Sequence, residues 1–458
     1  MMAFPSRILF ASLLTLGLAA CGPAAPGTPD DNNETNNQAN NQPEPVGNVL
    51  RSELNREANP DVDAETRAEL SAGNRDFAFD LFAQLRLEEG DDANIFVSPH
   101  SISLAMAMAY GGALNQTKSE MADVLRFTLA DDKLHPAFNA LDLELATRSE
   151  FASENEGDAF ALDIVNQTWG QQDFGFESDY LDMLAVHYGA EMRVVDFVND
   201  FDAIREQINA WVEAQTDDRI EDLLPEGVLD ETTRFILVNA IYFYGSWRSP
   251  FNEELTKDEP FTLLSGQTVD VPLMRQSDMF GFFEDDTTVA ASIPYVGDQV
   301  SLIAFMPADE NADFPAWEAD FSRDDFDAVA SAVRGVQNGR VTFPRFESEG
   351  EFKLSDTFKA MGMVDAFDKC DADFGGITGA DPCIDFVSLY ISEVLHKSFV
   401  SVDEEGTEAA AATAVIFATP PSAPLDPPDV RFDRPFYYAV YDHGTETVLF
   451  LGRMVDPS

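Results

Sequence analysis

The chain has 458 residues, 45% of them hydrophobic, so it can form one large domain or two ordinary ones around a substantial core. Its 28 Lys and Arg against 83 Asp and Glu give a formal net charge of −55. Nucleic acid and anionic lipid would repel so acidic a chain, which argues against a role on either. The acidity favours solubility, and it also suits a protein adapted to high salt, where screening removes the self-repulsion.

Residues 1–20 have the features of a secretion signal. Arg7 precedes an apolar run from Ile8 to Ala20 that is too short to span a bilayer. The run ends in Leu-Ala-Ala-Cys21, which resembles the lipobox of a bacterial lipoprotein, in which the cysteine is acylated. The alternative is an ordinary signal peptide beside a chance cysteine. The resemblance implies a lipid anchor at Cys21 and a place at the outer membrane or cell surface.

Residues 21–68 are dominated by Pro, Asn, Gln and Asp, with few apolar side chains. Such a segment cannot bury enough surface to fold, so we expect a disordered tether. Residues 61–70 could form a short helix within it. The folded domain is predicted to begin at residue 69 and to continue to residue 458.

The first half of this domain begins with a helix over 74–87, because Phe77, Leu81 and Leu85 lie on one helical face. The segment NIFVSPHSISLAMAMAYGGALNQTKSEM (94–121) predicts a short buried strand that ends at Ser98-Pro99. A helix with small residues on nearly every face follows, so it should lie deep in the core.

The later elements alternate between strands and helices. Residues 161–197 are interpreted as strand, turn, helix and strand, and residues 235–244 as a buried apolar strand. The remaining predictions are a hairpin over 258–274, a strand over 300–306, a strand over 340–346 with a helix over 351–364, and a long strand that ends near residue 406.

Residues 404–413, EEGTEAAAAT, have unusually small side chains. By itself this run suits either an alanine-rich helix or a fully buried strand. Five prolines between 420 and 428 then predict an extended loop that cannot be a central strand. A strand-capable run placed beside such a loop is unusual, because proteins normally suppress unpaired apolar strands.

The flanking sequence resolves the ambiguity. HKSFVSVDEEGTEAAAAT (396–413) followed by FDRPFYYAVYDHGTETVLFLGRMVDP (432–457) resembles the signature of the serpin family, and segments 94–121 and 208–251 are similar to it as well. The resemblance extends from about Asn74 to the C-terminus. It implies an α+β fold, with eight or nine helices around three β-sheets and a mobile reactive-centre loop at about 404–430.

By this resemblance the chain is an inhibitor of serine-type endopeptidases and not an enzyme, with the target protease as a covalent partner and no cofactor. The five histidines lie at positions 100, 135, 187, 396 and 443, and none is spaced from another as metal ligands are. No HExxH, GxSxG or Walker motif is present, so no catalytic or metal site is expected.

Several residues match serpin positions that control the opening of the central sheet. The shutter positions are Ser98, Ser101, Asn239 and His396, which are either a connected polar network or four separately bonded core residues. Trp247 and Arg345 match positions near the entry point of the loop. Arg345 is expected to form an exposed ion pair with Glu404, worth at most about 1 kcal/mol.

The hinge implied by the resemblance consists of ten residues: Glu404, Glu405, Gly406, Thr407, Glu408, Ala409, Ala410, Ala411, Ala412 and Thr413. After cleavage, residues from about Thr407 to Phe417 should insert into the central sheet. Every second side chain from Thr407 onward would be buried, and all of these are small or apolar. We therefore predict an active suicide-type inhibitor. The alternative is a non-inhibitory serpin that acts as a binding or structural module at the cell surface.

The reactive bond is less tightly fixed. Counting seventeen residues from Glu404, as the resemblance suggests, gives Pro420–Pro421, a bond that most serine proteases cleave poorly. The alternatives are Phe417–Ala418, Ala418–Thr419 and Pro421–Ser422. No basic residue precedes the bond, so an elastase- or chymotrypsin-like target is expected.

Two further expectations concern cross-links and cofactors. With Cys21 lipidated, Cys370 and Cys383 make an even pair and predict a disulfide, the alternative being two free thiols. A heparin-like polyanion is not expected, because Lys118 and Arg126 on the relevant helix are offset by acidic neighbours. The protein should be a monomer.

Overall fold

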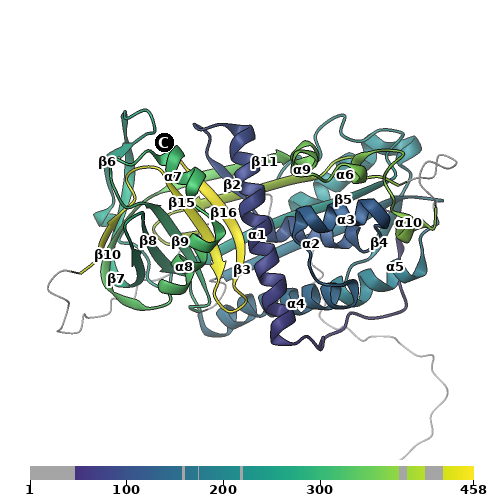
Figure 1. The fold of residues 1–458 in the computed structure, drawn as a ribbon, viewed down its shortest axis with the longest axis horizontal. Helices are drawn as coiled ribbons and strands as arrows, with labels where there is room; N and C mark the ends of the chain where they lie inside the picture. The colour runs from purple at the N-terminus through teal and green to yellow at the C-terminus, as the bar shows by residue number, and fades with distance from the viewer. Residues whose placement is uncertain (1–46, 157–159, 174, 217–219, 381–388, 408–426) are drawn as a thin grey trace, which may run out of the picture. The chain divides into compact units, whose positions relative to one another are not determined.

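The computed structural model describes residues 47–156, 160–173, 175–216, 220–380, 389–407 and 427–458. All of them belong to one compact unit that spans Gln42–Ser458. Strands and helices alternate along the chain and form two hydrogen-bonded strand networks with helices around them (Figure 1). Within the described ranges, no helix is both long enough and apolar enough to cross a membrane.

The first sheet has seven strands, and it holds the hinge. Its spatial order is β1 (Asn48–Leu50), β4 (Met192–Val195), β3 (Phe160–Gln171), β5 (Phe235–Ser246), β13 (Gly406–Thr407), β12 (Leu395–Val402) and β11 (Phe346–Lys353). β3 pairs antiparallel with β5 along most of the length of both strands. β12 and β11 pair antiparallel over eight residues on the other side.

The second network has nine strands. Eight of them run in the order β14 (Asp429–Arg431), β10 (Val336–Pro344), β7 (Thr268–Glu284), β8 (Thr288–Pro294), β9 (Val300–Pro307), β15 (Phe436–Asp442), β16 (Thr447–Met454) and β2 (Ile95–Val97), and β6 (Lys257–Thr262) pairs with β7. The long strand β7 joins two sheets, since β6 and β10 pair with residues 268–281 and β8 pairs with residues 281–284. The three-sheet α+β class expected from the sequence is therefore confirmed.

Ten α-helices lie in the described residues, against the eight or nine expected. They are α1 (Ala64–Glu89), α2 (Pro99–Tyr110), α3 (Asn115–Leu125), α4 (Asp131–Glu156), α5 (Ser178–Met183), α6 (Phe197–Gln215), α7 (Phe314–Asp320), α8 (Arg323–Ala332), α9 (Leu354–Met361) and α10 (Gly375–Thr378). The last of these has only four residues. A π-helical turn, Leu184–Tyr188, and two short 3₁₀ turns, Glu253–Leu255 and Asp365–Phe367, complete the set.

Helix α2 lies between the two sheets, as its small side chains predicted. All twelve of its residues are buried, and it contacts β5 in the first sheet and β16 in the second. The short strand β2 before it passes so close to β11 that a Cβ on Gly350 would meet the carbonyl oxygen of Phe96 at 1.9 Å. Only glycine fits this crossing, because any side chain would push the two backbones apart.

Residues 47–68 lie on the folded body, whereas the sequence analysis assigned them to the tether. β1 pairs antiparallel with β4 at the edge of the first sheet. Arg56 donates to Asn139 and Asp142 of α4, and the amide of Glu57 donates to the carbonyl of Val186. The predicted short helix at 61–70 is the first part of α1, which begins at an N-cap formed by Asp63. These contacts come from residues more than 80 positions away, so the local composition gave no sign of them.

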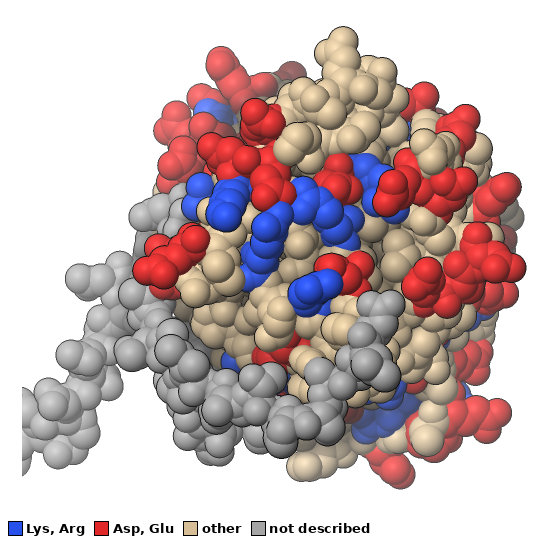
Figure 2. Space-filling model, turned by 90° about the vertical axis from the view of Figure 1, so that its left-hand side faces the viewer, with Lys and Arg blue, Asp and Glu red and all other residues tan. Residues whose placement is uncertain are grey.

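Basic side chains gather at the end of the molecule that carries β6, β7, β10 and β14 (Figure 2). Ranges 257–284, 336–345 and 429–434 hold six basic and seven acidic residues, so their formal charge is −1 while that of the whole chain is −55. We call the group of Lys257, Arg275, Arg340, Arg431 and Arg434 the arginine face.

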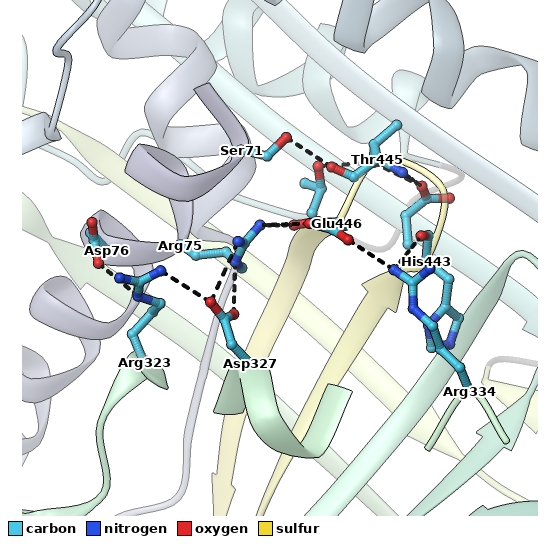
Figure 3. A network of polar contacts seen from close by, with 11 residues as sticks. Ser71, Arg75, Asp76, Arg323, Asp327, Arg334, His443, Thr445 and Glu446 are labelled. Atoms are coloured by element: carbon cyan, nitrogen blue, oxygen red, sulfur yellow. Dashed lines mark hydrogen bonds and ion pairs between the residues drawn. The ribbon is translucent and has the colours of Figure 1, made fainter. Parts of the chain in front are cut away.

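A second group of charges fastens α1 to α8 and to the turn between β15 and β16 (Figure 3). Arg75 is 7% exposed, and its guanidinium group contacts Asp327 at 2.9 Å and the carbonyl of Glu446 at 2.8 Å. Arg323 contacts the same Asp327 at 3.0 Å, but it lies nearer the surface. The network therefore has a buried member, Arg75, and a partly exposed member, Arg323, that share one carboxylate.

We expect Arg75→Met to lower the free energy of unfolding by about 3 kcal/mol, because it leaves the Glu446 carbonyl and part of Asp327 without their buried partner. The more exposed Arg323→Met should cost less than about 1 kcal/mol. Urea unfolding followed by circular dichroism measures both. Equal losses for the two variants would show that burial of Arg75 does not set the strength of the network.

Candidate functional site

The hinge already occupies the top of the gap between β5 and β12. Gly406 and Thr407 form strand β13, in which Thr407 lies opposite Gly245 of β5 and Val402 of β12. The sequence analysis expected insertion from Thr407 onward only after cleavage. The structure corrects this, since the first strand residues of the loop are in place in the uncleaved chain.

A tight turn brings the chain from β12 back into the sheet. The Asp403 carboxylate accepts hydrogen bonds from the amides of Glu405, at 2.8 Å, and Gly406, at 3.1 Å. The Trp247 indole nitrogen donates to the Asp403 carbonyl at 2.9 Å. A Cβ on Gly406 would meet the Gly245 carbonyl oxygen at 2.2 Å, so the entry into the sheet requires glycine.

Glu404 lies inside this turn and is buried, with 5% exposure. Thr256 donates to its carboxylate at 2.6 Å, and the amide of Phe251 donates to its carbonyl at 2.7 Å. Arg345 is 3.6 Å away and half exposed. The pair of Arg345 and Glu404 was predicted to be exposed on both sides. That prediction is wrong for Glu404, which the side chains of a distant segment cover.

Glu405, the next residue, lies among other carboxylates. Burial raises the pKa of its carboxyl group, and the charges of Asp403, Glu253 and Glu404 raise it further. The turn therefore concentrates negative charge where the chain passes from β12 into β13, beside a polar pocket that Arg345 and Lys257 also line.

Thr407 is seated in an aromatic pocket. It is 1% exposed, and its hydroxyl lies 2.7 Å from the hydroxyl of Tyr295. The Tyr295 ring stacks on Trp247 with a centroid distance of 4.7 Å, and Phe243 packs edge-on against it at 5.1 Å. A small side chain with a single hydroxyl matches this pocket, and a charged one would be buried without a partner.

Below the hinge, β5 and β12 pair with each other directly and in parallel. The pairing joins His396 to Asn239 and Lys397 to Ala240. Ser98 caps α2, donates its amide to His396 Nε2 at 3.1 Å and donates its hydroxyl to the Leu449 carbonyl at 2.7 Å. Ser101 donates its amide to the Ser98 hydroxyl oxygen at 3.3 Å. Three of the four predicted shutter residues are thus linked through Ser98, and Asn239 lies in register beside His396.

The arrangement is a sheet with a strand-wide gap, a loop whose first residues are already in the gap, and a polar contact that closes the remainder. A family model described as Serpin (serine protease inhibitor) matches residues 72–457. The chain belongs to the serpin family.

Characterised and uncharacterised serpins are similar to it over nearly their full length. Serpin B3 of Homo sapiens is 36% identical over 400 residues, which cover 85% of this chain and 99% of that protein. The leukocyte elastase inhibitor of Xenopus laevis is 32% identical and is covered to 99%, again over 85% of this chain. An uncharacterized serpin-like protein of Thermococcus kodakarensis is 37% identical, with 83% of this chain and 84% of that protein covered.

Solved serpin structures have the same fold. The native state of the thermophilic serpin tengpin matches with a TM-score of 0.74 and 26% identity, covering 89% of this chain and 97% of that one. Thyroxine-binding globulin complexed with thyroxine matches with a TM-score of 0.71 and 28% identity, covering 86% and 100%. Members with different roles thus share this architecture, so the family supports protease inhibition in general without fixing the target.

Part of the predicted site lies outside the described residues. The parts outside the described residues are Glu408–Thr413 of the hinge, every candidate reactive bond between 417 and 422, Cys21 and Cys383. Cys370 is disulfide-bonded, and its pairing with Cys383 stays a prediction. The loop predicted at about 404–430 is shorter at both ends, because 406–407 and 429–431 form β13 and β14.

Sequence reasoning missed four residues that hold the hinge: Thr256, Tyr295, Phe251 and Asp403. Tyr295 follows the mostly buried strand β8, and Thr256 lies in the short connection before β6, so neither segment marks its residue as a contact of the hinge. Their role arises only when the hinge folds back against them, where Thr256 contacts Glu404 and Tyr295 contacts Thr407. Asp403 could have been found, because an Asp followed by Glu-Glu-Gly at a strand end is typical of a turn that caps its own amides.

All five histidines are buried or partly buried, and burial lowers the pKa of each one. The pKa falls to about 4 for His100 and His135, and to about 3 for His396. These folded-state values lie below the ordinary 6.5, so the native protein keeps the rings neutral while the unfolded chain protonates them. Their contribution is complete above pH 6.5 and is lost as the pH falls through about 4.

We therefore expect the free energy of unfolding to drop by about 1.4 kcal/mol per pH unit for each such histidine between pH 6.5 and 4. His396→Gln is the matched variant, because a Gln carbonyl can accept the same hydrogen bond from Ser98 without titrating. A plot of its free energy of unfolding against pH should be less steep than that of the wild type by the slope of one histidine. An unchanged slope would mean that His396 does not carry this pH dependence.

Proposed function

We propose that this serpin inhibits serine-type endopeptidases, of elastase- or chymotrypsin-like specificity, as a suicide substrate. The protease attacks the loop and forms an acyl ester on its own serine. Cleavage frees the hinge, and the residues after Thr407 extend β13 down the gap between β5 and β12 as a new strand. Serpin loop insertion is a known example of strand addition that releases stored strain, and in this chain the strands involved would be β5 and β12.

The observation that carries the proposal is the position of Thr407. It lies buried between β5 and β12, in register with both strands, and the chain after it is Glu408 and then Ala, Ala, Ala, Ala and Thr. Insertion buries every second side chain, and small residues at these positions need no rearrangement of the core. Hinges with bulky, charged or proline residues would stop at this point.

The test is incubation of the full-length protein with chymotrypsin and with pancreatic elastase, followed by denaturing electrophoresis. An inhibitor gives an SDS-stable band at the summed mass. The bond between enzyme and serpin in this band is an ester, so base should break it. Mass spectrometry of the released C-terminal peptide identifies the reactive bond. Clean cleavage with full recovery of protease activity would contradict the proposal and favour a serpin that serves as a binding or structural module.

We further propose that the mature protein is a lipoprotein anchored through Cys21 at the outer membrane or cell surface. The lipobox-like sequence before Cys21 supports this, as does a Pro- and Asn-rich segment long enough to hold the folded unit away from a membrane. Labelling with a radioactive fatty acid in the wild type, and its loss in Cys21→Ser, would support the anchor. Equal labelling of both would contradict it.

A further inference from the structure

The arginine face borders both described ends of the loop. At one end, Glu404 in the turn before β13 lies 3.6 Å from Arg345, and at the other end the carbonyl of Pro428 accepts a hydrogen bond from the amide of Arg340 at 2.8 Å. Any protease that holds the residues between these ends in its active site must therefore lie over this end of the molecule. Figure 2 views this end of the molecule and shows the basic side chains gathered on it.

The arginines of this face are fixed in place before anything binds. Arg275 and Arg431 lie on either side of Thr342 in register, so both point to the same side of the sheet. Each donates to Glu259, at 2.5 and 2.7 Å, and Arg431 and Arg434 share Asp433. Three guanidinium groups thus share two carboxylates, which leaves one positive charge in excess.

Two more cations extend this surface. Arg340 lies two residues from Thr342 on β10, so it points to the same side; it is 56% exposed and pairs with Asp429 at 2.7 Å. Lys257 at the start of β6 is also exposed. Because the Arg side chains are already ordered by their ion pairs, a partner would lose less side-chain entropy in binding them than in binding free ones.

The same end of the molecule carries exposed apolar groups. Met279 and Val336, on the paired strands β7 and β10, are 41% and 52% exposed. A groove beside Arg431 and Arg434 is lined by Phe282 and Phe283 among others. Arg, Met and aromatic residues are enriched where proteins recognise one another, whereas a solvated surface of this chain would be expected to follow its general acidity.

We propose that the arginine face is a docking surface for the body of the target protease, and that it fits an enzyme whose rim around the active site is acidic. This deepens the proposed function and rests on it. A serpin of charge −55 repels an acidic enzyme at long range. The three ranges that form this surface carry a formal charge of only −1, with the acidic turn Asp403–Glu405 at their border, so the repulsion is weaker there, and the fixed guanidinium groups can pair with opposing carboxylates.

The experiment compares two variants of equal charge. The face variant removes three positive charges from the arginine face and is Lys257→Gln/Arg340→Gln/Arg431→Gln. The control variant removes three exposed positive charges elsewhere and is Arg51→Gln/Arg67→Gln/Arg126→Gln. The probe is chymotrypsin whose lysines have been succinylated, which makes its surface acidic, with unmodified chymotrypsin beside it. Association rate constants are measured at about 0.01 M and about 1 M salt, where the Debye length is about 30 and about 3 Å.

We expect the face variant to associate with succinylated chymotrypsin about tenfold more slowly than the wild type at low salt, with the difference lost at high salt. The control variant should stay within about twofold of the wild type, since its charges lie outside the contact. With unmodified chymotrypsin, the face variant should not be slowed. Equal rates for both variants, with SDS-stable complexes formed throughout, would overturn the docking surface and leave the inhibitor function standing.

Two other outcomes also overturn it. If no variant forms an SDS-stable complex with either enzyme, the proposed function fails and the docking surface falls with it. If the rates do not depend on the arginine face but retention on heparin–agarose does, the face is a polyanion site instead of a protease contact. Thermal unfolding of the face variant within a few degrees of the wild type confirms that the rates compare folded proteins.

Discussion

Cleavage between residues 417 and 422 is expected to raise the midpoint of thermal unfolding by on the order of 20 °C. A new strand of about ten residues adds about 20 ladder hydrogen bonds at about 1 kcal/mol each, against about 1–2 kcal/mol per residue for ordering the chain. Burial of alternate small side chains brings the net gain to about 5–10 kcal/mol. Each kcal/mol is worth about 2–4 °C in a domain of roughly 200 residues and less in a larger one.

Calorimetry of the intact protein and of the protein nicked by elastase measures this difference. Mass spectrometry shows that cleavage is complete and confined to the loop. Nicked Ala411→Pro is the control, because proline removes a ladder hydrogen bond in the middle of the new strand and should cancel most of the rise. If the nicked wild type melts at the temperature of the intact protein, the chain is not held short of its most stable form and the proposed mechanism is wrong.

Replacement of Thr407 by Arg is expected to turn the inhibitor into a substrate. The native side chain is 1% exposed and bonded to Tyr295, so Arg either stays out of the sheet or brings an unpaired charge into an aromatic pocket. A penalty of about 3 kcal/mol on the insertion step slows it about a hundredfold. The protease then hydrolyses the ester before it is trapped, and the moles of serpin consumed per mole of enzyme should rise at least about tenfold.

This ratio is measured directly by titrating chymotrypsin of known active-site concentration with the serpin. Thr407→Ser keeps the hydroxyl that contacts Tyr295 and should inhibit like the wild type. Circular dichroism of uncleaved Thr407→Arg must first match the wild type, so that the loss is assigned to the hinge and not to misfolding. A covalent complex formed by Thr407→Arg at the wild-type ratio would contradict insertion through β13.

The elements that local pattern determines were predicted well from the sequence. Segment 94–121 gave β2 and α2 because Ser98-Pro99 ends one and starts the other, and the apolar run at 235–244 gave most of β5. The contact between Ser98 and His396 was expected from the family resemblance and not from spacing, since 298 positions separate the two residues.

The misses have a common physical cause, which is that long-range contacts decide them. β1 has three residues and owes its existence to β4, more than 140 positions later. Glu404 looked like a solvated acid because its burial depends on Thr256 and on the backbone of Phe251. A single sequence contains no local signal for such contacts, so neither the end of the tether nor the depth of the hinge could be read from composition or periodicity.

The strand pairing between β5 and β12 is confined, in the described residues, to the pairs His396–Asn239 and Lys397–Ala240. Above it β13 already lies between the two strands, so under the proposed mechanism this pairing must separate before the new strand is complete. In that mechanism, separation of the two strands competes with hydrolysis of the acyl ester by water. Under the proposed mechanism, substitutions at this pairing should change the ratio of trapped to hydrolysed ester more than they change the affinity of the first encounter between the two proteins.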